Sequence, residues 1–312
     1  MGNDNKIKAK PFLKWAGGKS QLINTIDPYF LPYEILETKK IKNYVEPFIG
    51  GGALFFYLMS EYKVKKSYIS DTNEDLILTY NVIKKRPKEL INELFELKSN
   101  FPSEYEFQKK RYGDIRKRFN NLKNELDYGK CSKNHVLQAA YLIFLNKTCF
   151  NGIYRVNSKG EFNVPMGRYK NPSIYDESNI LNISKLIKKT TIVNDSYEAS
   201  KNHITNGSFV YLDPPYRPIT ETSFTSYTKS NFNDTNQKQL ANFYEKISVD
   251  ANVLLSNSDP KNKDVNDNFF DELYGNFTIK RVPAKRFVNR DGNNRGPINE
   301  ILVCNYPIKY EE

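Results

Sequence analysis

The sequence predicts an α/β fold in which both ends of the chain contribute strands to one parallel sheet and the segment between them forms a mostly helical insert. Three observations lead to this prediction. Strand-length and helix-length apolar patterns alternate at both ends of the chain. The strands are rich in Val, Ile, Leu and Tyr with little alternation, which is typical of parallel strands buried on both faces. A stretch of short helical patterns separates the two ends.

The two ends of the chain differ in the elements that they supply. In the N-terminal part we expect strands at residues 43–48 and 67–71 and helices at residues 50–62 and 73–85. In the C-terminal part we expect a helix near residues 236–247 and strands at residues 191–194, 209–213, 253–257, 277–282 and 301–305. We therefore assign residues 1–85 and 191–312 to one discontinuous domain.

The insert comprises residues 86–190. Proline-bearing breaks divide its first part into short helices. Residues 153–156 and 161–164 flank a glycine-bearing turn, which predicts a β-hairpin. A basic hairpin of this size fits the major groove of DNA.

Composition excludes several classes of protein. With 39% hydrophobic and 14% aromatic residues the chain is too apolar for a disordered protein, yet its apolar runs are far shorter than a membrane span. The N-terminus lacks the apolar segment of a secretory signal, so we expect a cytoplasmic protein. Three cysteines and two histidines without metal-ligand spacing predict reduced thiols and no metal site.

Positive charge is concentrated in one part of the sequence. The net charge is +11, from 47 basic and 36 acidic residues. Residues 81–190 carry 22 basic and 11 acidic side chains, whereas the rest of the chain carries 25 of each. This segment is the candidate for contact with nucleic-acid phosphates. Lysine-rich helices that are merely solvated would give the same count, so charge alone leaves both interpretations open.

The segment Asp213-Pro214-Pro215-Tyr216 carries the most informative chemistry, and it suits attack by an aromatic amine such as N6 of adenine. That nitrogen becomes nucleophilic as it moves toward sp3 geometry, and two acceptors aimed at its N–H groups favour the change. The Asp213 carboxylate and the Pro214 carbonyl supply two acceptors, while Tyr216 offers a ring for stacking. Such a pocket requires the adenine to flip out of the duplex. A rigid turn after a strand is the alternative.

Two further segments fit a nucleoside cofactor. Near the N-terminus, Trp15 and Lys19 surround paired glycines, which suits a loop that closes over an adenosyl or carboxylate group. Residues 44–52 form a strand followed by three glycines, which let the backbone approach a ligand at a helix N-terminus. Asp71 ends the next strand, where an acid can bind ribose hydroxyls. Capping of the helix that begins at Asn73 is the alternative role.

Together these residues resemble the Dam-type N6-adenine DNA methyltransferases, and within them the DpnM-like enzymes of GATC restriction–modification systems. The resemblance covers nearly the whole chain. Its motifs are Lys14-Trp15-Ala16-Gly17-Gly18-Lys19, Glu46-Pro47-Phe48-Ile49-Gly50-Gly51-Gly52, Asp71 with Asn73, Asn151-Gly152 with Arg155, Phe162-Asn163-Val164-Pro165, Gly167-Arg168-Tyr169, Asp213-Pro214-Pro215-Tyr216, Phe224-Thr225-Ser226-Tyr227 and Leu255-Ser256-Asn257. The resemblance implies a Rossmann-like S-adenosylmethionine methyltransferase sheet, with residues 86–190 as its target-recognition insert.

The resemblance also implies roles for individual residues. The target adenine would be held by Asp213, Pro214, Pro215 and Tyr216. The cofactor S-adenosylmethionine would be bound by Trp15, Lys19, Phe48, Gly50, Asp71, Asp195, Tyr197 and Asp213. Double-stranded DNA would be contacted by Lys14, Phe150, Asn151, Arg155, Arg168 and Tyr169. A restriction endonuclease that acts on the same site, without binding this chain, would be a functional partner.

Two of the implied DNA contacts have a specific chemistry. Arg155 would read a guanine edge, because a guanidinium matches guanine O6 and N7 with two hydrogen bonds. Phe150 stands where family members often carry tyrosine, so a hydroxyl contact to a phosphate is lost while stacking or wedge insertion is kept.

Two alternatives stay open at this point. The same acid-Pro-Pro-Tyr pocket serves methyltransferases that act on RNA adenine or on protein glutamine, and the basic insert with its hairpin favours duplex DNA over these. The second alternative is a non-catalytic DNA-binding module derived from such an enzyme. The intact segment from Asp213 to Tyr216 and the intact cofactor segments argue against it.

Overall fold

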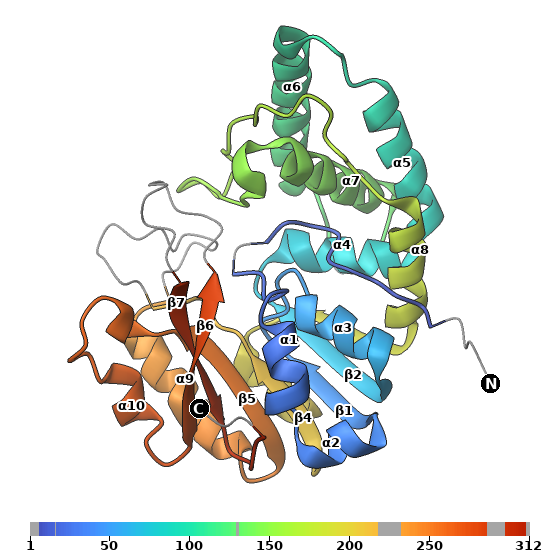
Figure 1. Ribbon diagram of the computed structural model, residues 1–312. Coiled ribbons are helices and arrows are strands. Elements are labelled where there is room, and N and C mark those ends of the chain that lie inside the picture. The colour runs from blue at the N-terminus through green and yellow to red at the C-terminus, as the bar shows by residue number, and fades with distance from the viewer. Residues whose placement is uncertain (1–5, 16, 129–130, 218–231, 286–296, 310–312) are drawn as a thin grey trace.

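The computed structural model of the protein describes residues 6–15, 17–128, 131–217, 232–285 and 297–309. These residues form a seven-stranded sheet with the strand order β3-β2-β1-β4-β5-β7-β6 (Figure 1). The strands are β1 (Lys40–Glu46), β2 (Lys63–Asp71), β3 (Thr191–Asn194), β4 (Ser208–Leu212), β5 (Ala251–Ser258), β6 (Thr278–Lys285) and β7 (Pro297–Cys304). The prediction that both ends of the chain build one sheet is confirmed.

The helices include α1 (Ile23–Thr25), α2 (Tyr33–Thr38), α3 (Ala53–Glu61), α4 (Glu74–Lys85), α5 (Pro87–Ser99), α6 (Tyr105–Lys123), α7 (Lys133–Thr148), α8 (Glu177–Leu186), α9 (Asp234–Ile247) and α10 (Phe269–Leu273). Short helical turns of other types are η1 (Ile26–Phe30), η2 (Phe150–Gly152), η3 (Ile187–Lys189), η4 (Tyr197–His203) and η5 (Pro260–Asn262).

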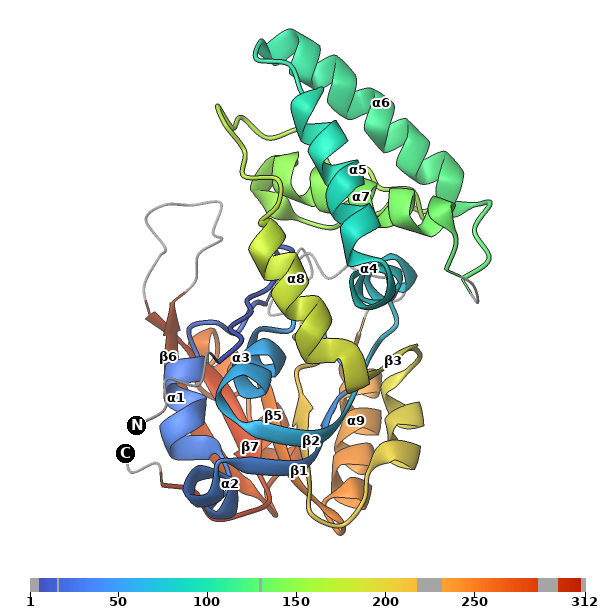
Figure 2. The same cartoon turned by 90° about the vertical axis from the view of Figure 1, so that its right-hand side faces the viewer.

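The sheet is buried on both faces, as the lack of alternation in its strands predicts. Tyr44 and Tyr211 belong to the hydrophobic cluster that includes residues of α3 and α4. Their neighbours Val45 and Val210 belong to a second cluster, which includes residues of α9 and α10. Figure 2 shows α9 and α8 on opposite faces of the sheet. Because successive side chains of a strand point to opposite faces, each strand contributes to both clusters.

The sheet is not parallel throughout, which corrects the expectation from sequence. β3, β2, β1, β4 and β5 pair in parallel, whereas β7 pairs antiparallel with both β5 and β6. Strands β6 and β7 are separated only by residues 286–296. A parallel connection needs a crossover of a dozen or more residues, so a short connection forces the antiparallel arrangement.

The middle of the chain is mostly helical. Helices α5, α6 and α7 extend to one side of the sheet, above its upper edge in Figures 1 and 2. Helix α7 packs against α4, α5 and α6, whereas α8 packs against α3 as well as α4 and α5 and so lies beside the sheet. The division into residues 1–85 with 191–312 and residues 86–190 stays a prediction.

The hairpin of the insert is held partly by a neighbouring helix. Its strands share one bridge, between Val156 and Phe162. Beyond this bridge, Asn120 on α6 accepts a hydrogen bond from the Phe162 backbone nitrogen at 2.8 Å and donates one to the Phe162 carbonyl at 3.1 Å. Tyr112 on the same helix donates to the Val164 carbonyl at 2.7 Å. Side chains of α6 therefore provide the hairpin backbone with hydrogen-bond partners that a longer strand pairing would otherwise provide.

Within the described residues, no helix is long and apolar enough to cross a membrane. His135, one of two histidines, has a structural role at the start of α7. Its ring nitrogens hydrogen-bond to Ser132 and to the Asp127 carbonyl, at 2.9 Å each.

Candidate active site at the carboxyl edge of the sheet

The predicted site residues meet where the order of the strands reverses. Strand β1 lies between β2 and β4, and Val45 on β1 pairs with Val210 on β4. The glycine loop that begins at Gly50 follows β1, and Asp213 follows β4 directly. In doubly wound sheets the crevice outside the carboxyl ends of such neighbouring strands is where ligands bind.

Lys19 joins the N-terminal loop to the end of β4. Its ammonium lies 2.8 Å from Asp213 Oδ1, donates to the Gly17 carbonyl at 2.6 Å, and sits 4.5 Å from the centre of the Tyr216 ring. The side chains of Lys19 and Asp213 are 4% and 19% exposed. A lysine this deeply buried requires a charged partner, so the ion pair fixes the loop against the Asp-Pro-Pro-Tyr segment.

The Asp213 carboxylate is held in a defined orientation. Ser256 on β5 donates to Asp213 Oδ1 at 2.9 Å, and the Ser256 hydroxyl in turn hydrogen-bonds to Tyr211 at 2.9 Å. Both the lysine and the serine contact Oδ1, and within the described chain no bond is found to Oδ2. Burial raises the pKa of Asp213, and the neighbouring ammonium of Lys19 partly offsets this.

Side chains from distant elements support the two prolines and the tyrosine. Gln237 on α9 donates to the Pro215 carbonyl at 3.1 Å. The Tyr216 hydroxyl donates to Glu300 Oε2 on β7 at 2.6 Å. Sequence reasoning did not identify Gln237 or Glu300, since each lies far along the chain from the motif. Ser256 was named only within a motif of the resemblance, without a role. Residues 224–227 of that resemblance lie outside the described residues.

The glycine loop makes room for Trp15. Gly50 has a φ of +44°, and a Cβ atom there would lie 2.9 Å from Trp15 Cδ1. Gly52 has a φ of +69°, and a Cβ atom there would lie 2.6 Å from the Tyr80 hydroxyl. Any side chain at these positions would both strain the backbone and displace a neighbouring ring. The loop and the Trp15 ring thus form one wall of the site.

Asp71 binds the backbone of the same loop. Its Oδ2 accepts from the Gly50 nitrogen at 3.1 Å, and its Oδ1 accepts from the Asn73 nitrogen at 2.9 Å. The N-cap of α4 is Asn73, whose side chain accepts from the Leu76 nitrogen. Asp71 is therefore not the cap of this helix, and its carboxylate lies next to the glycine loop instead.

The site is rich in carboxyl groups. Burial raises the pKa of Asp71 to about 6, against hydrogen bonds from Asn73 and Gly50 that lower it. Burial also raises the pKa of Glu46, at the end of β1, where the Tyr44 hydroxyl donates to it at 2.6 Å. With Asp213, three buried carboxyl groups thus lie at the ends of neighbouring strands, and burial raises the pKa of each.

The other predicted cofactor residues lie at the ends of β1 and β3. The rings of Phe48 and Tyr197 stack with centroids 5.4 Å apart. Asp195 is exposed after β3, and its carboxylate accepts from the Ser196 nitrogen at 2.7 Å. The structure brings Phe48 and Tyr197 into contact, whereas the Asp195 carboxylate binds the backbone of its own neighbour in the chain.

The predicted DNA-contacting residues cluster around the segment that follows α7. Phe150 is 54% exposed, and Asn151 next to it has a φ of 57°. Lys14 and Arg168 are exposed, and the Lys14 ammonium lies 5.1 Å from the centre of the Tyr169 ring. These residues therefore share one surface of aromatic and basic side chains, although they come from three separate segments.

Two hydrogen-bonding residues tie this surface together. Asn146 on α7 accepts from the Lys14 nitrogen at 2.8 Å and donates to the carbonyls of Lys14 and Gly152 at 2.8 and 2.9 Å. Arg155 donates from Nε to Asn163 Oδ1 at 2.7 Å across the hairpin. The surface predicted to contact DNA is thus attached to the same N-terminal loop that carries Trp15.

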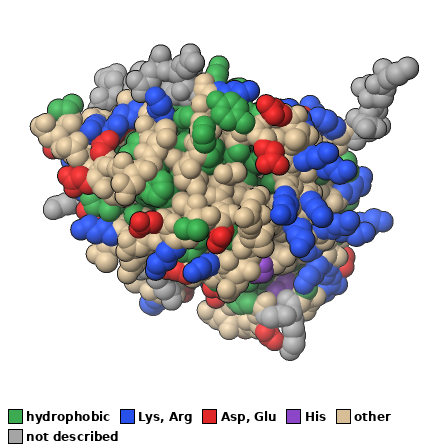
Figure 3. Space-filling view, turned by 90° about the horizontal axis from the view of Figure 1, so that it is seen from below, with side chains coloured by type: hydrophobic (Ala, Val, Ile, Leu, Met, Phe, Trp, Pro, Cys, Tyr) green, Lys and Arg blue, Asp and Glu red, His purple; other side chains and the backbone are tan. Residues whose placement is uncertain are grey.

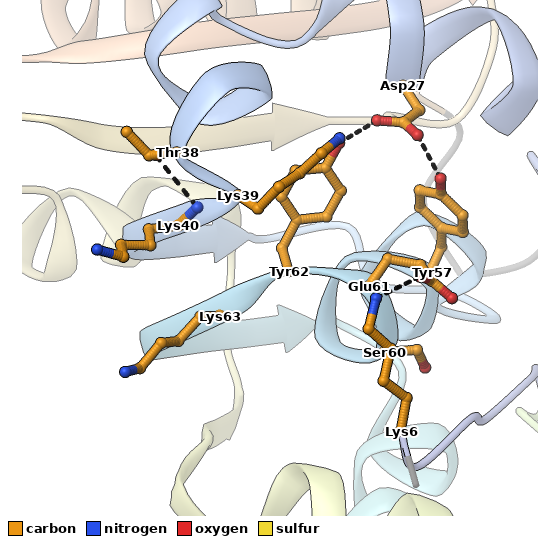
Figure 4. Close-up of a pocket in the computed structure, with 10 residues that line it drawn as sticks. All are labelled: Lys6, Asp27, Thr38, Lys39, Lys40, Tyr57, Ser60, Glu61, Tyr62 and Lys63. Atoms are coloured by element: carbon orange, nitrogen blue, oxygen red, sulfur yellow. Dashed lines mark hydrogen bonds and ion pairs between the residues drawn. The ribbon is translucent and has the colours of Figure 1, made fainter. Parts of the chain in front are cut away.

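A cavity of about 540 Å³ lies at the opposite, amino edge of the sheet (Figure 4). Its polar groups contact one another: Tyr57 and Tyr62 donate to Asp27, and Lys6 pairs with Glu61 at 3.1 Å. We place the candidate site at the carboxyl edge, because the motif residues meet there and none of them lines this cavity.

Basic side chains also gather at the amino edge, which Figure 3 shows from below. The exposed lysines at the starts of β1 and β2 are Lys40, Lys42, Lys63, Lys65 and Lys66. Positive surface charge is therefore not confined to the insert.

Comparison with known proteins identifies the family of the chain. The family model of the D12 class N6 adenine-specific DNA methyltransferases matches residues 15–288. The chain is 49% identical to the Type II methyltransferase M.MjaIII of Methanocaldococcus jannaschii, over 96% of this chain and all of that protein. It is 39% identical to the Type II methyltransferase M1.LlaDCHI of Lactococcus lactis subsp. cremoris, and 32% identical to a DNA adenine methylase of Vibrio cholerae. These two matches cover 97% and 96% of this chain, and 97% of each relative. The protein therefore belongs to the D12 class N6 adenine-specific DNA methyltransferases.

Proposed function

We propose that this enzyme transfers the methyl group of S-adenosylmethionine to N6 of an adenine that is flipped out of double-stranded DNA. One observation carries the proposal: the Lys19–Asp213 ion pair lies where the loop bearing Trp15 meets the Asp-Pro-Pro-Tyr segment, at the ends of neighbouring strands. A group held by the loop and a base held by the segment would be adjacent there.

The residues of the site match the chemical groups of S-adenosylmethionine. The Lys19 ammonium suits its carboxylate. Asp71 lies beside the glycine loop, where an acid can accept hydrogen bonds from ribose hydroxyls. Trp15 and the Phe48–Tyr197 pair offer ring faces for packing. When bound, the cofactor supplies a methyl group made electrophilic by the sulfonium.

Asp213 would bind the adenine amino group through Oδ2, the carboxylate oxygen that Lys19 and Ser256 do not contact. Lys19 and Ser256 both bind Oδ1, so Oδ2 can accept one N6 hydrogen. The Pro214 carbonyl would accept the other, and both acceptors favour the sp3 geometry that the nitrogen adopts as it is methylated. These acceptors are fixed before the reaction, so little reorganisation is needed during the transfer.

Tyr216 would stack on the flipped base, and Phe150 would fill the gap that the base leaves in the duplex. The bond to Glu300 fixes the Tyr216 ring, and Lys19 lies over that ring. The adenine would stack on the face opposite Lys19. Phe150, which is more than half exposed, would enter the duplex as an apolar wedge.

We further propose that the insert, residues 86–190, binds the duplex and selects GATC. The aromatic and basic surface around Phe150 supports DNA binding, and Arg155 is the proposed reader of a guanine. Two relatives are named Type II methyltransferases. By that similarity the enzyme would protect DNA from a restriction endonuclease of the same specificity, without binding it.

The test is to incubate the purified protein with radiolabelled S-adenosylmethionine and with duplex DNA, RNA or protein in parallel. We expect label in N6-methyladenine of duplex DNA alone, and single-molecule sequencing should place the modified base in GATC. Label in RNA or protein would refute the substrate, and methylation at another sequence would refute the specificity alone.

A further inference from the structure

Tyr154 lies where the proposed cofactor pocket meets the hairpin of the insert. Its ring stacks on Trp15 with centroids 5.5 Å apart and an interplanar angle of 27°. The same ring contacts Phe162, on the returning strand of the hairpin, at 5.8 Å between centroids. Tyr154 is only 3% exposed. Because interiors are closely packed, a shift of either neighbouring ring must move this side chain.

The Tyr154 hydroxyl is anchored on a buried carboxylate. It donates to Asp75 Oδ2 at 2.8 Å, and the Asp75 side chain has no exposure to solvent. Lys123 on α6 binds the same oxygen at 2.7 Å, while Gln138 on α7 and Tyr128 donate to Oδ1 at 3.1 and 3.3 Å. Loss of one donor would leave a buried carboxylate oxygen with fewer hydrogen bonds, which destabilises the fold. The four donors therefore keep Asp75 and the Tyr154 hydroxyl in fixed positions.

Asp75 and Tyr154 are each close in sequence to a residue of the proposed function. Asp75 lies in the first turn of α4, directly after the segment in which Asp71 binds the Asn73 nitrogen. Arg155, the proposed guanine reader, follows Tyr154 directly and is held on Asn163. The pair therefore connects a wall and a carboxylate of the cofactor pocket to the backbone that presents Arg155.

We propose that Tyr154 is a positioning residue that couples the two binding events, with Asp75 as its anchor. A cofactor packed against Trp15 fixes the Tyr154 ring and thereby the backbone of Arg155. A guanine bound by Arg155 fixes the same backbone and thereby the pocket. Each ligand then binds more tightly in the presence of the other, by the same factor in both directions. This inference rests on the proposed function, since it takes Trp15 and Arg155 in their proposed roles.

The experiment measures the dissociation constant of a fluorescent duplex that contains the unmethylated target site. The measurement is made with and without saturating sinefungin, an unreactive analogue of S-adenosylmethionine. For the wild type we expect sinefungin to tighten binding of this duplex by about fivefold or more, a typical coupling between sites. Tyr154→Phe keeps the ring against Trp15 but loses the bond to Asp75. In this variant we expect sinefungin to tighten binding of the duplex by less than about twofold. Its affinity for sinefungin alone should stay within about twofold of the wild type.

Tyr128→Phe is the matched control, because it removes another hydroxyl from the same carboxylate. It should leave the coupling factor at the wild-type value. Equal loss of coupling in both variants would show that Asp75 acts only through general stability and would overturn the assignment to Tyr154. Melting temperatures of the two variants, measured in parallel, show whether both fold equally well.

Trp15 provides a second readout, because it is the one tryptophan of the chain. Adding the cognate duplex without cofactor should change its fluorescence in the wild type and much less in Tyr154→Phe. An equal response in both proteins would contradict the coupling. If the wild-type protein binds both sinefungin and the cognate duplex, but sinefungin does not change its affinity for the duplex, only this inference fails. If it does not bind sinefungin, the proposed function fails as well.

Discussion

Replacing Asp213 with asparagine tests the centre of the site. The substitution keeps the shape of the side chain and an oxygen for Ser256, but it removes the charge that pairs with Lys19. The Lys19 ammonium, at 4% exposure, is then left with the Gly17 carbonyl and the Tyr216 ring. This change affects both the stability of the fold and the methyl transfer, and the two effects can be measured separately.

The expected loss of stability follows from the burial of the pair. Breaking a buried ion pair by removing one partner costs about 3–5 kcal/mol. Asp213 is 19% exposed and Lys19 keeps other contacts, so we expect about half of this, roughly 2 kcal/mol, in chemical denaturation. Adding Lys19→Met to Asp213→Asn removes the stranded ammonium and should restore part of that stability.

The expected loss of activity follows from the lost acceptor. Single-turnover methyl transfer at saturating cofactor and DNA should slow by about 100-fold or more, since a preorganised electrostatic contact is removed. The double variant should stay equally slow although it is more stable. Turnover near the wild-type rate in Asp213→Asn would refute the proposed role of the carboxylate. A double variant less stable than the single one would refute the account of the ion pair.

Three further predictions concern the cofactor pocket and the insert. Gly50→Ala should weaken sinefungin binding by about tenfold or more, because its Cβ atom would meet Trp15 at 2.9 Å, while binding to random DNA stays unchanged; unchanged sinefungin affinity would contradict this. Sinefungin affinity should fall as the pH drops below 6, because the Asp71 carboxylate, whose pKa is raised to about 6, becomes protonated there. Calorimetry at several pH values should show that the logarithm of the dissociation constant depends on pH with a slope smaller by about one proton in Asp71→Asn than in the wild type. Arg155→Ala should cost about 1–3 kcal/mol at the cognate site and relax specificity at one base pair, whereas Lys170→Ala should weaken binding to all sequences. Equal losses of methylation on all single-base variants would show that Arg155 does not read sequence.

Local sequence patterns were sufficient to predict the fold class and the segments that meet at the candidate site. Strands without polar alternation indicated a sheet covered on both faces, because only such a position buries every residue. The glycine loop and the Asp-Pro-Pro-Tyr segment were recognisable because each places special backbone chemistry within a few residues. Both kinds of information lie in short stretches of chain, where spacing alone defines geometry.

Tertiary structure alone decided how these parts are joined. Glu300 supports Tyr216 from β7, and Asp75 gathers donors from α6 and α7 beside Tyr154. The antiparallel pairing of β6 and β7 likewise became clear only from the register of the strands. Contacts of this kind join residues far apart in the chain, and a single carboxylate or tyrosine has the same appearance in the sequence whether it faces solvent or a buried partner. Only the folded chain, which brings each side chain to its partners, separates these cases.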